Sequence, residues 1–88
     1  SSYRVLMDTN MDKSLKADII KIITTIDGID HVDDVVAKPI GVKYIVIVKV
    51  SVHGEMTVNE SHGIAARIRE NIRKLKNIGD VVVHINPV

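Results

Sequence analysis

The chain has 88 residues, of which 45% are hydrophobic, and a formal net charge of +1. A chain of this length forms one domain with a single core, which is too small for a deep catalytic cleft between domains. The charge argues against general affinity for nucleic acid, and the absence of Phe and Trp disfavours base stacking. The absence of cysteine excludes disulfides, thiolate catalysis and cysteine-based zinc sites.

The N-terminal part of the chain divides into a short mixed segment and an apolar repeat. Residues 1–8 are predicted to be a tether that leads into the fold, and residues 9–88 to be the folded domain. Thr9 and Asp12 resemble a capping pair, which predicts a helix that starts there and that Asp27-Gly28 ends. Its apolar stripe is Met11, Leu15, Ile19, Ile20, Ile22, Ile23 and Ile26.

A β-hairpin is predicted next, with strands over residues 31–40 and 42–53 and a bend at Pro39-Ile40-Gly41. In the second strand the alternate valines from Val46 to Val52 face the core. Ile45 and Ile47 point to the opposite side, which is exposed in a sheet that is covered on one face only. We therefore expect a second copy of the chain to cover this outer face, or else two isoleucines that are simply tolerated in water.

The segment Thr57-Val58-Asn59-Glu60 has the pattern of a capping box and predicts a helix from Thr57 to about Leu75. The last strand, over residues 80–88, alternates apolar and polar residues. The order helix, strand, strand, helix, strand predicts an α+β two-layer αββαβ sandwich with both helices on one face of a three-stranded sheet. The predicted buried stripe of the second helix is Val58, Ser61, Ala65, Ile68, Ile72 and Leu75.

Enzyme motifs are not found in this sequence. No G-x-S-x-G segment, phosphate loop or nicotinamide fingerprint occurs, and the adjacent Ser61 and His62 diverge on a helix. We therefore predict that the domain is not an enzyme. Histidines and carboxylates gather toward one face instead, and together they suit zinc and neighbouring divalent transition metals. These residues are His31, Asp33, Asp34, His53, His62 and His84.

Four segments carry a resemblance to a known family. They are L-M-D (residues 6–8), G-I-D-H-V-D-D-V-V-A-K-P-I-G (28–41), M-T-V-N-E-S-H-G-I-A (56–65) and V-V-V-H-I-N-P (81–87). In content, order and spacing they resemble the C-terminal cytoplasmic domain of cation diffusion facilitator (cation efflux) transporters, over essentially the whole chain. The resemblance implies a metallochaperone-like, ferredoxin-like fold, a homodimer, and attachment to the cytoplasmic side of a membrane domain that exports divalent metal.

The resemblance also implies metal positions. His62 and His84 match metal positions of the family, and Asp33 stands where many relatives have histidine. Lys49 replaces a histidine and Asn86 an aspartate of zinc-binding relatives, so the chain should bind fewer or weaker ions, because an ammonium repels a divalent cation. His53 lies on the same strand face as Lys49, either as a substitute ligand or as a turn histidine in solvent. The predicted ligands are His62, His84, Asp33, His53 and Asp34, with zinc as the expected metal.

The predicted function is a cytosolic metal-sensing and dimerisation domain of an efflux transporter for zinc, manganese, iron or cobalt. The resemblance implies that the parent protein is a cation/proton antiporter. We expect no nucleic-acid partner, because a KH-like RNA-binding module needs a G-x-x-G loop and this chain has none. A small-molecule-sensing regulatory domain of an enzyme stays open as a second alternative.

Overall fold

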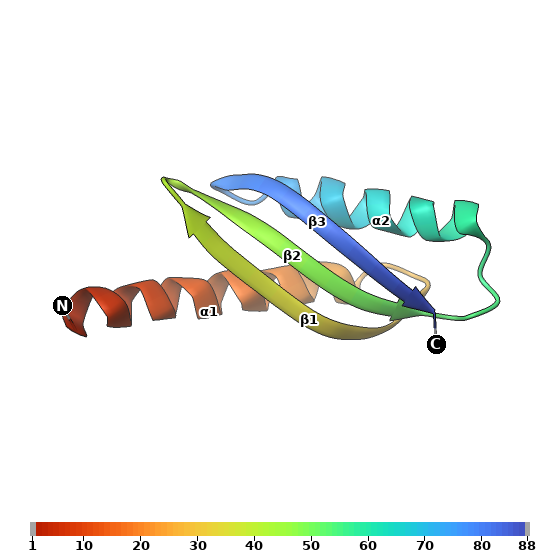
Figure 1. The fold of residues 1–88 in the computed structure, drawn as a ribbon, viewed down its shortest axis with the longest axis horizontal. Coiled ribbons are helices and arrows are strands. Elements are labelled where there is room, and N and C mark those ends of the chain that lie inside the picture. The colour runs from red at the N-terminus through yellow and green to blue at the C-terminus, as the bar shows by residue number, and fades with distance from the viewer. Residues whose placement is uncertain (1, 88) are drawn as a thin grey trace.

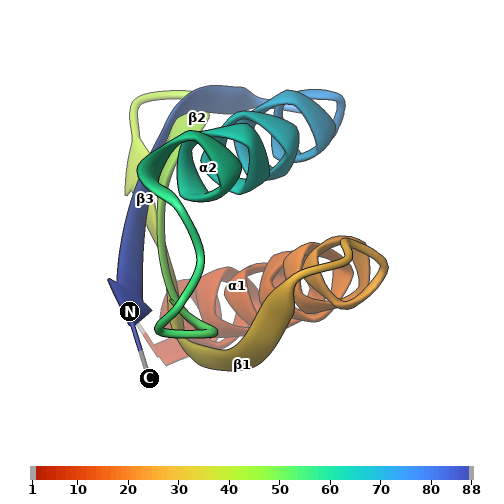
Figure 2. The same ribbon diagram turned by 90° about the vertical axis from the view of Figure 1, so that its right-hand side faces the viewer.

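The computed structural model describes residues 2–87, with side chains for residues 13–87. The elements are α1 (Ser2–Thr24), β1 (Ile29–Ile40), β2 (Lys43–Val52), α2 (Val58–Arg73) and β3 (Ile78–Pro87). In the sheet, β2 lies in the middle, antiparallel to β1 and parallel to β3. Both helices cover the same face of the sheet (Figures 1 and 2). This confirms the predicted αββαβ two-layer sandwich.

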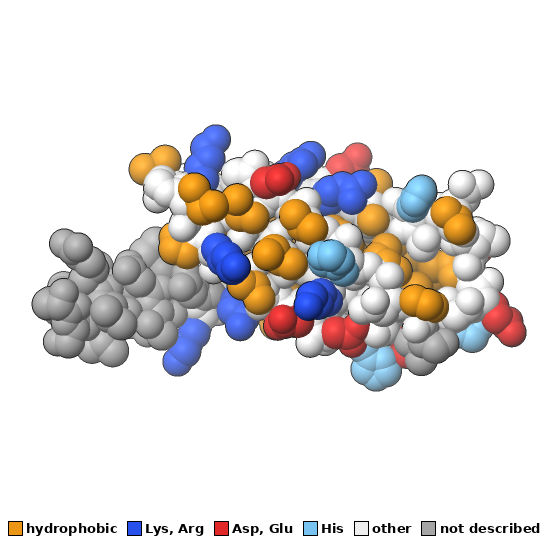
Figure 3. Space-filling view, viewed as in Figure 1, with side chains coloured by type: hydrophobic (Ala, Val, Ile, Leu, Met, Phe, Trp, Pro, Cys, Tyr) orange, Lys and Arg blue, Asp and Glu red, His pale blue; other side chains and the backbone are white. Residues whose placement is uncertain are grey.

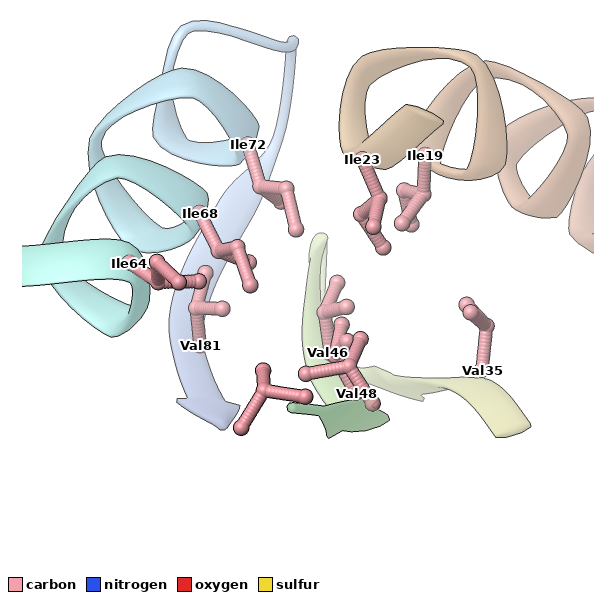
Figure 4. Close-up of a cluster of buried hydrophobic side chains, with 11 residues drawn as sticks. Ile19, Ile23, Val35, Val46, Val48, Ile64, Ile68, Ile72 and Val81 are labelled. Carbon is pink, nitrogen blue, oxygen red and sulfur yellow. The ribbon is translucent and has the colours of Figure 1, made fainter. Parts of the chain in front are cut away.

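The core lies between the helices and the inner face of the sheet (Figure 4). The four alternate valines of β2 are buried, as predicted from strand periodicity. Three details of the predicted stripes are wrong. Ile20 is exposed, and Val58 is 69% exposed because it begins the first turn of α2, whereas Ile64 is buried and was not predicted. The buried hydrophobic cluster is Ile19, Ile23, Val35, Val46, Val48, Val50, Val52, Ile64, Ile68, Ile72 and Val81.

The predicted start of the first helix is wrong. Helix α1 begins at Ser2 and continues through Thr9, so the preceding segment is helical rather than an irregular tether. Residues 2–8 contain neither glycine nor proline, so no residue there stops a helix. The helix ends at Thr24, before Gly28, whose φ of +96° nevertheless fits the predicted left-handed glycine. Met11, which was predicted to belong to the apolar stripe, lies outside the residues whose side chains the structure describes.

The start of α2 confirms the predicted capping box. The Thr57 Oγ1 atom accepts a hydrogen bond from the Glu60 backbone N–H at 3.1 Å, and the Glu60 Oε1 atom accepts one from the Thr57 N–H at 3.0 Å. These hydrogen bonds to the ionised carboxylate lower the pKa of Glu60 from its ordinary value of 4.5. The first turn of α2 is therefore fixed in place, and His62 follows directly after it.

Neither helix within residues 2–87 is long and apolar enough to cross a membrane. The two helices differ in length, since α1 has 23 residues and α2 has 16. Helix α2 connects the end of β2 to the start of β3, which is the crossover that a parallel strand pair requires. This connection puts β3 at one edge of the sheet, with its inner face under α2.

Candidate functional site

The face of the sheet opposite the helices, called the outer face here, carries an apolar row across the three strands. Ile47 on β2 pairs with Val36 on β1 and with Val82 on β3. Ile45 precedes it on the same side of β2, and both isoleucines are only partly buried. Figure 3 shows hydrophobic side chains gathered over the strands on the face that no helix covers. The described part of the chain thus leaves a contiguous apolar surface open.

A polar row lies beside the apolar one. Lys49 on β2 pairs with Asp34 on β1 and with His84 on β3, and all three side chains are exposed. Paired residues have Cβ atoms roughly 5 Å apart, so the lysine stem stands between the imidazole and the carboxylate. In Figure 3 a histidine, a lysine and an acidic side chain lie next to one another near the middle of this face.

A β-bulge brings a second carboxylate to the outer face. The register passes from Val32↔Val50 to Asp34↔Lys49, so Asp33 and Asp34 together oppose one residue of β2. The Asp33 Oδ2 atom accepts a hydrogen bond of 2.6 Å from the Ser51 hydroxyl. Sequence reasoning named both aspartates as ligand candidates but missed Ser51 as the partner of Asp33. No local signal identifies that pair, because it depends on the bulge.

His62 lies apart from the polar row of the outer face. It lines a groove of about 540 Å³ between α2 and the edge of β3, together with Arg69, Val83 and Ile85. Val83 and Ile85 alternate with His84 along β3, so His62 and His84 lie on opposite sides of that strand. The Arg69 guanidinium at the same groove disfavours a cation beside the His62 ring.

The two remaining histidines have carboxylate neighbours close in sequence. The His53 Nε2 atom lies 3.7 Å from Glu55 Oε2, at the end of β2, and both side chains are exposed. The His31 Nδ1 atom lies 2.8 Å from Asp30 Oδ2, also in the open. His53 therefore follows the polar row beyond Ser51 but does not join it.

The described residues of one copy do not form a closed metal site. Within the part of the chain whose side chains are described, no three His, Asp or Glu side chains lie close enough together to hold an ion. Imidazole and carboxylate suit a divalent transition metal by type, but a structural zinc site uses four ligands. Among the predicted ligands, Asp33 and Asp34 share the bulge, Lys49 separates them from His84, and His62 and His53 lie elsewhere. Among the side chains that the structure describes, the candidate donors of one copy therefore stay apart.

Residues 11–88 match the family model described as cation efflux protein, cytoplasmic domain. The chain belongs to this family. This cation efflux cytoplasmic domain is 29% identical, over 87 residues, to the manganese efflux system protein MneP of Bacillus subtilis (strain 168). The match covers 98% of the domain and 29% of the relative, so the domain spans less than a third of the relative's length.

Two solved structures share the fold of this chain. The metal-bound C-terminal domain of the CzcD transporter from Thermotoga maritima has a TM-score of 0.80 and 25% identity, over 84% of this chain and 87% of that one. The cytosolic domain of a cation diffusion facilitator family protein has a TM-score of 0.75 and 22% identity, over 97% and 95%. The family consists of transporter domains rather than enzymes. The family match therefore favours the transporter domain over the KH-like RNA-binding module and the small-molecule-sensing regulatory domain.

Proposed function

We propose that this cation efflux cytoplasmic domain is the metal-sensing and dimerisation domain of a transporter for zinc, manganese, iron or cobalt that exchanges the cation for protons. The observation that carries the proposal is the open outer face, on which Ile47 pairs with Val36 and Val82. A contiguous apolar surface of this kind is typical of a protein interface. Residues 1–8 would connect the domain to the membrane part of the transporter, and residues 9–88 would form the regulatory domain.

The proposed homodimer uses the outer face of both copies. A two-fold interface brings the same patch of each copy together, so Ile45 and Ile47 would pack on their counterparts and leave water. The polar row beside them would lie at the same interface. This arrangement gives carboxylates and imidazoles of one copy access to those of the other, which one copy alone does not bring together.

The proposed metal ligands are His62, His84, Asp33, His53 and Asp34, drawn from two copies. An ion bound by Asp33, Asp34 and His84 of two copies would hold these outer-face donors together and so would stabilise the dimer, whereas His62, in the groove between α2 and β3, would bind an ion apart from this interface. Zinc is supported by the imidazoles, and manganese by the carboxylates and by the efflux substrate in the name of MneP. The ammonium of Lys49 in the polar row keeps the expected affinity low.

Sedimentation velocity and calorimetric titration test this proposal. We expect the purified domain to sediment as a dimer, Ile47→Asp to sediment as a monomer, and Ile20→Asp to stay dimeric. Ile20 is the matched control because it is an exposed isoleucine on α1, on the other side of the sheet. Unchanged sedimentation of Ile47→Asp would show that the outer face is not the interface.

The metal part has a separate readout. We expect heat of zinc or manganese binding at neutral pH in the wild type, and weaker binding in His84→Ala and His62→Ala. Metal binding that neither substitution weakens would refute His62 and His84 as ligands, but it would not bear on the proposed dimer. No binding of either metal at neutral pH would refute the metal-sensing role.

A further inference from the structure

The turn between β1 and β2 carries two large hydrophobic side chains into water. Val42 is 85% exposed and Ile40 is 58% exposed, on either side of Gly41, which has a φ of +62°. Turns usually have polar residues that hydrogen-bond to their own backbone, whereas Ile and Val contribute nothing to the turn itself. The turn therefore presents an apolar tip that the packing of the domain does not explain.

Four exposed lysines surround this tip. Lys38 precedes it on β1, and Lys43 follows it as the first residue of β2. The loop after α2 supplies Lys74 and Lys76, and it lies beside the start of β2, since the Tyr44 backbone N–H donates a hydrogen bond of 2.7 Å to the Asn77 carbonyl. We call the two hydrophobic residues and the four lysines the basic tip.

Acidic residues near the basic tip do not cancel its charge. Asp80, at the start of β3, lies 3.5 Å from the guanidinium of Arg73. Asp18 lines a hollow of about 390 Å³ behind the turn, where Lys76 is also part of the wall. The lysines that flank the turn itself, Lys38 and Lys43, have no carboxylate within ion-pair distance among the described residues.

The basic tip lies at the end of the molecule where α1 begins. Figure 1 shows the β1–β2 turn and the α2–β3 loop at this end, opposite the C-terminus. The CzcD structure is of a C-terminal domain of a transporter, so in that protein the membrane part precedes the domain. With the same order here, which rests on the proposed function, the chain would enter α1 from the membrane and the basic tip would face the bilayer.

We propose that the basic tip docks on the anionic cytoplasmic surface of the lipid bilayer. Ile40 and Val42 enter the interfacial region, and the lysine ammonium groups bind lipid phosphates. Apolar burial and attraction to anionic lipid act together in interfacial binding. Each lysine near such a surface strengthens binding about fivefold. The contact holds the domain in a defined orientation below the membrane and does not depend on the outer face or on metal.

Tryptophan fluorescence gives a direct test, because the chain contains no tryptophan. Val42→Trp places the indole at the tip, and Val58→Trp is the matched control, since Val58 is also a well-exposed valine but begins α2 at the far end of the molecule. We expect vesicles of phosphatidylcholine and phosphatidylglycerol to shift the emission of Val42→Trp to shorter wavelength. Vesicles of phosphatidylcholine alone, and Val58→Trp with either vesicle, should give no shift.

Charge removal adds a quantitative arm. In the Val42→Trp background, Lys43→Gln with Lys76→Gln should weaken partitioning to anionic vesicles about 25-fold, and added salt should weaken it further. Circular dichroism of each variant checks that the fold is intact. Ile47→Asp in the same background should still show the emission shift with anionic vesicles, even as a monomer, which separates the basic tip from the proposed dimer interface.

Two outcomes would overturn the proposal. The first is no emission shift of Val42→Trp with anionic vesicles, and the second is an equal shift of Val58→Trp. If the shift is absent, protection of Val42→Cys from a thiol reagent in the detergent-solubilised full-length transporter would make the membrane domain, and not lipid, the partner of the tip.

Discussion

Gly28 has the closest neighbour among the glycines of the described chain and allows a quantitative prediction. Its φ is +96°, and a Cβ atom added there would lie 2.7 Å from Ile64 Cδ1 on α2. Gly28→Ala therefore combines backbone strain of about 1–2 kcal/mol with overlap that costs about 1–3 kcal/mol. We expect the free energy of unfolding to fall by about 2–5 kcal/mol, a large part of the stability of a small domain.

Gly41→Ala separates the two contributions. Gly41 has a φ of +62°, but a Cβ atom there would meet nothing within 4 Å. This variant should lose about 1–2 kcal/mol from the backbone alone. The second control is Ile64→Val, which removes the Cδ1 atom and by itself costs about 0.5–1.5 kcal/mol. In the Gly28→Ala background, Ile64→Val should cost less than in the wild type, because it removes the Cδ1 atom that the new Cβ atom overlaps.

Urea unfolding followed by circular dichroism measures all four variants. The protein concentration must be the same throughout, because self-association adds to the measured stability. Equal losses in Gly28→Ala and Gly41→Ala, or strictly additive effects in the double variant Gly28→Ala with Ile64→Val, would refute the reasoning that Ile64 closes over Gly28.

Three further predictions concern the polar row and α2. Lys49→His should raise zinc affinity at least about tenfold in a calorimetric titration, because it removes a positive charge and adds an imidazole beside His84. Lys49→Met removes the charge alone and should raise the affinity less. Equal gains in the two variants would refute the role of the added imidazole as a ligand. Because hydrogen bonds lower the pKa of Glu60, its charge stabilises the fold above pH 4.5, and this contribution is lost as the pH falls through the lowered pKa. Urea unfolding should therefore show that Glu60→Gln is less stable than the wild type at neutral pH and equal to it in acid, and a deficit independent of pH would contradict this. Gly63→Ala should raise the free energy of unfolding by about 0.5–1 kcal/mol, because Gly63 lies within α2 and an added Cβ there meets nothing within 4 Å; a loss of stability would contradict the open space.

Local patterns predicted those features that depend on residues close together in the chain. The capping box joins Thr57 to Glu60 within a single turn, and the valines of β2 alternate at every second position. The same reasoning failed at Thr9, because a capping residue there does not end a helix that already runs from Ser2. It also placed Val58 in the core, because helical periodicity does not show that this residue begins the first turn of α2, where its side chain is exposed.

The sequence by itself determined the element order, the inner face of β2, the family resemblance and the candidate ligands. Only the tertiary structure decided which candidates meet. The parallel register puts Lys49 beside His84, and the bulge brings Asp33 to Ser51. Such pairs depend on strands that are distant in the chain, and a shift of one residue would turn each side chain to the other face. For that reason only the folded domain shows that Lys49 separates the His84 imidazole from the carboxylates of the bulge.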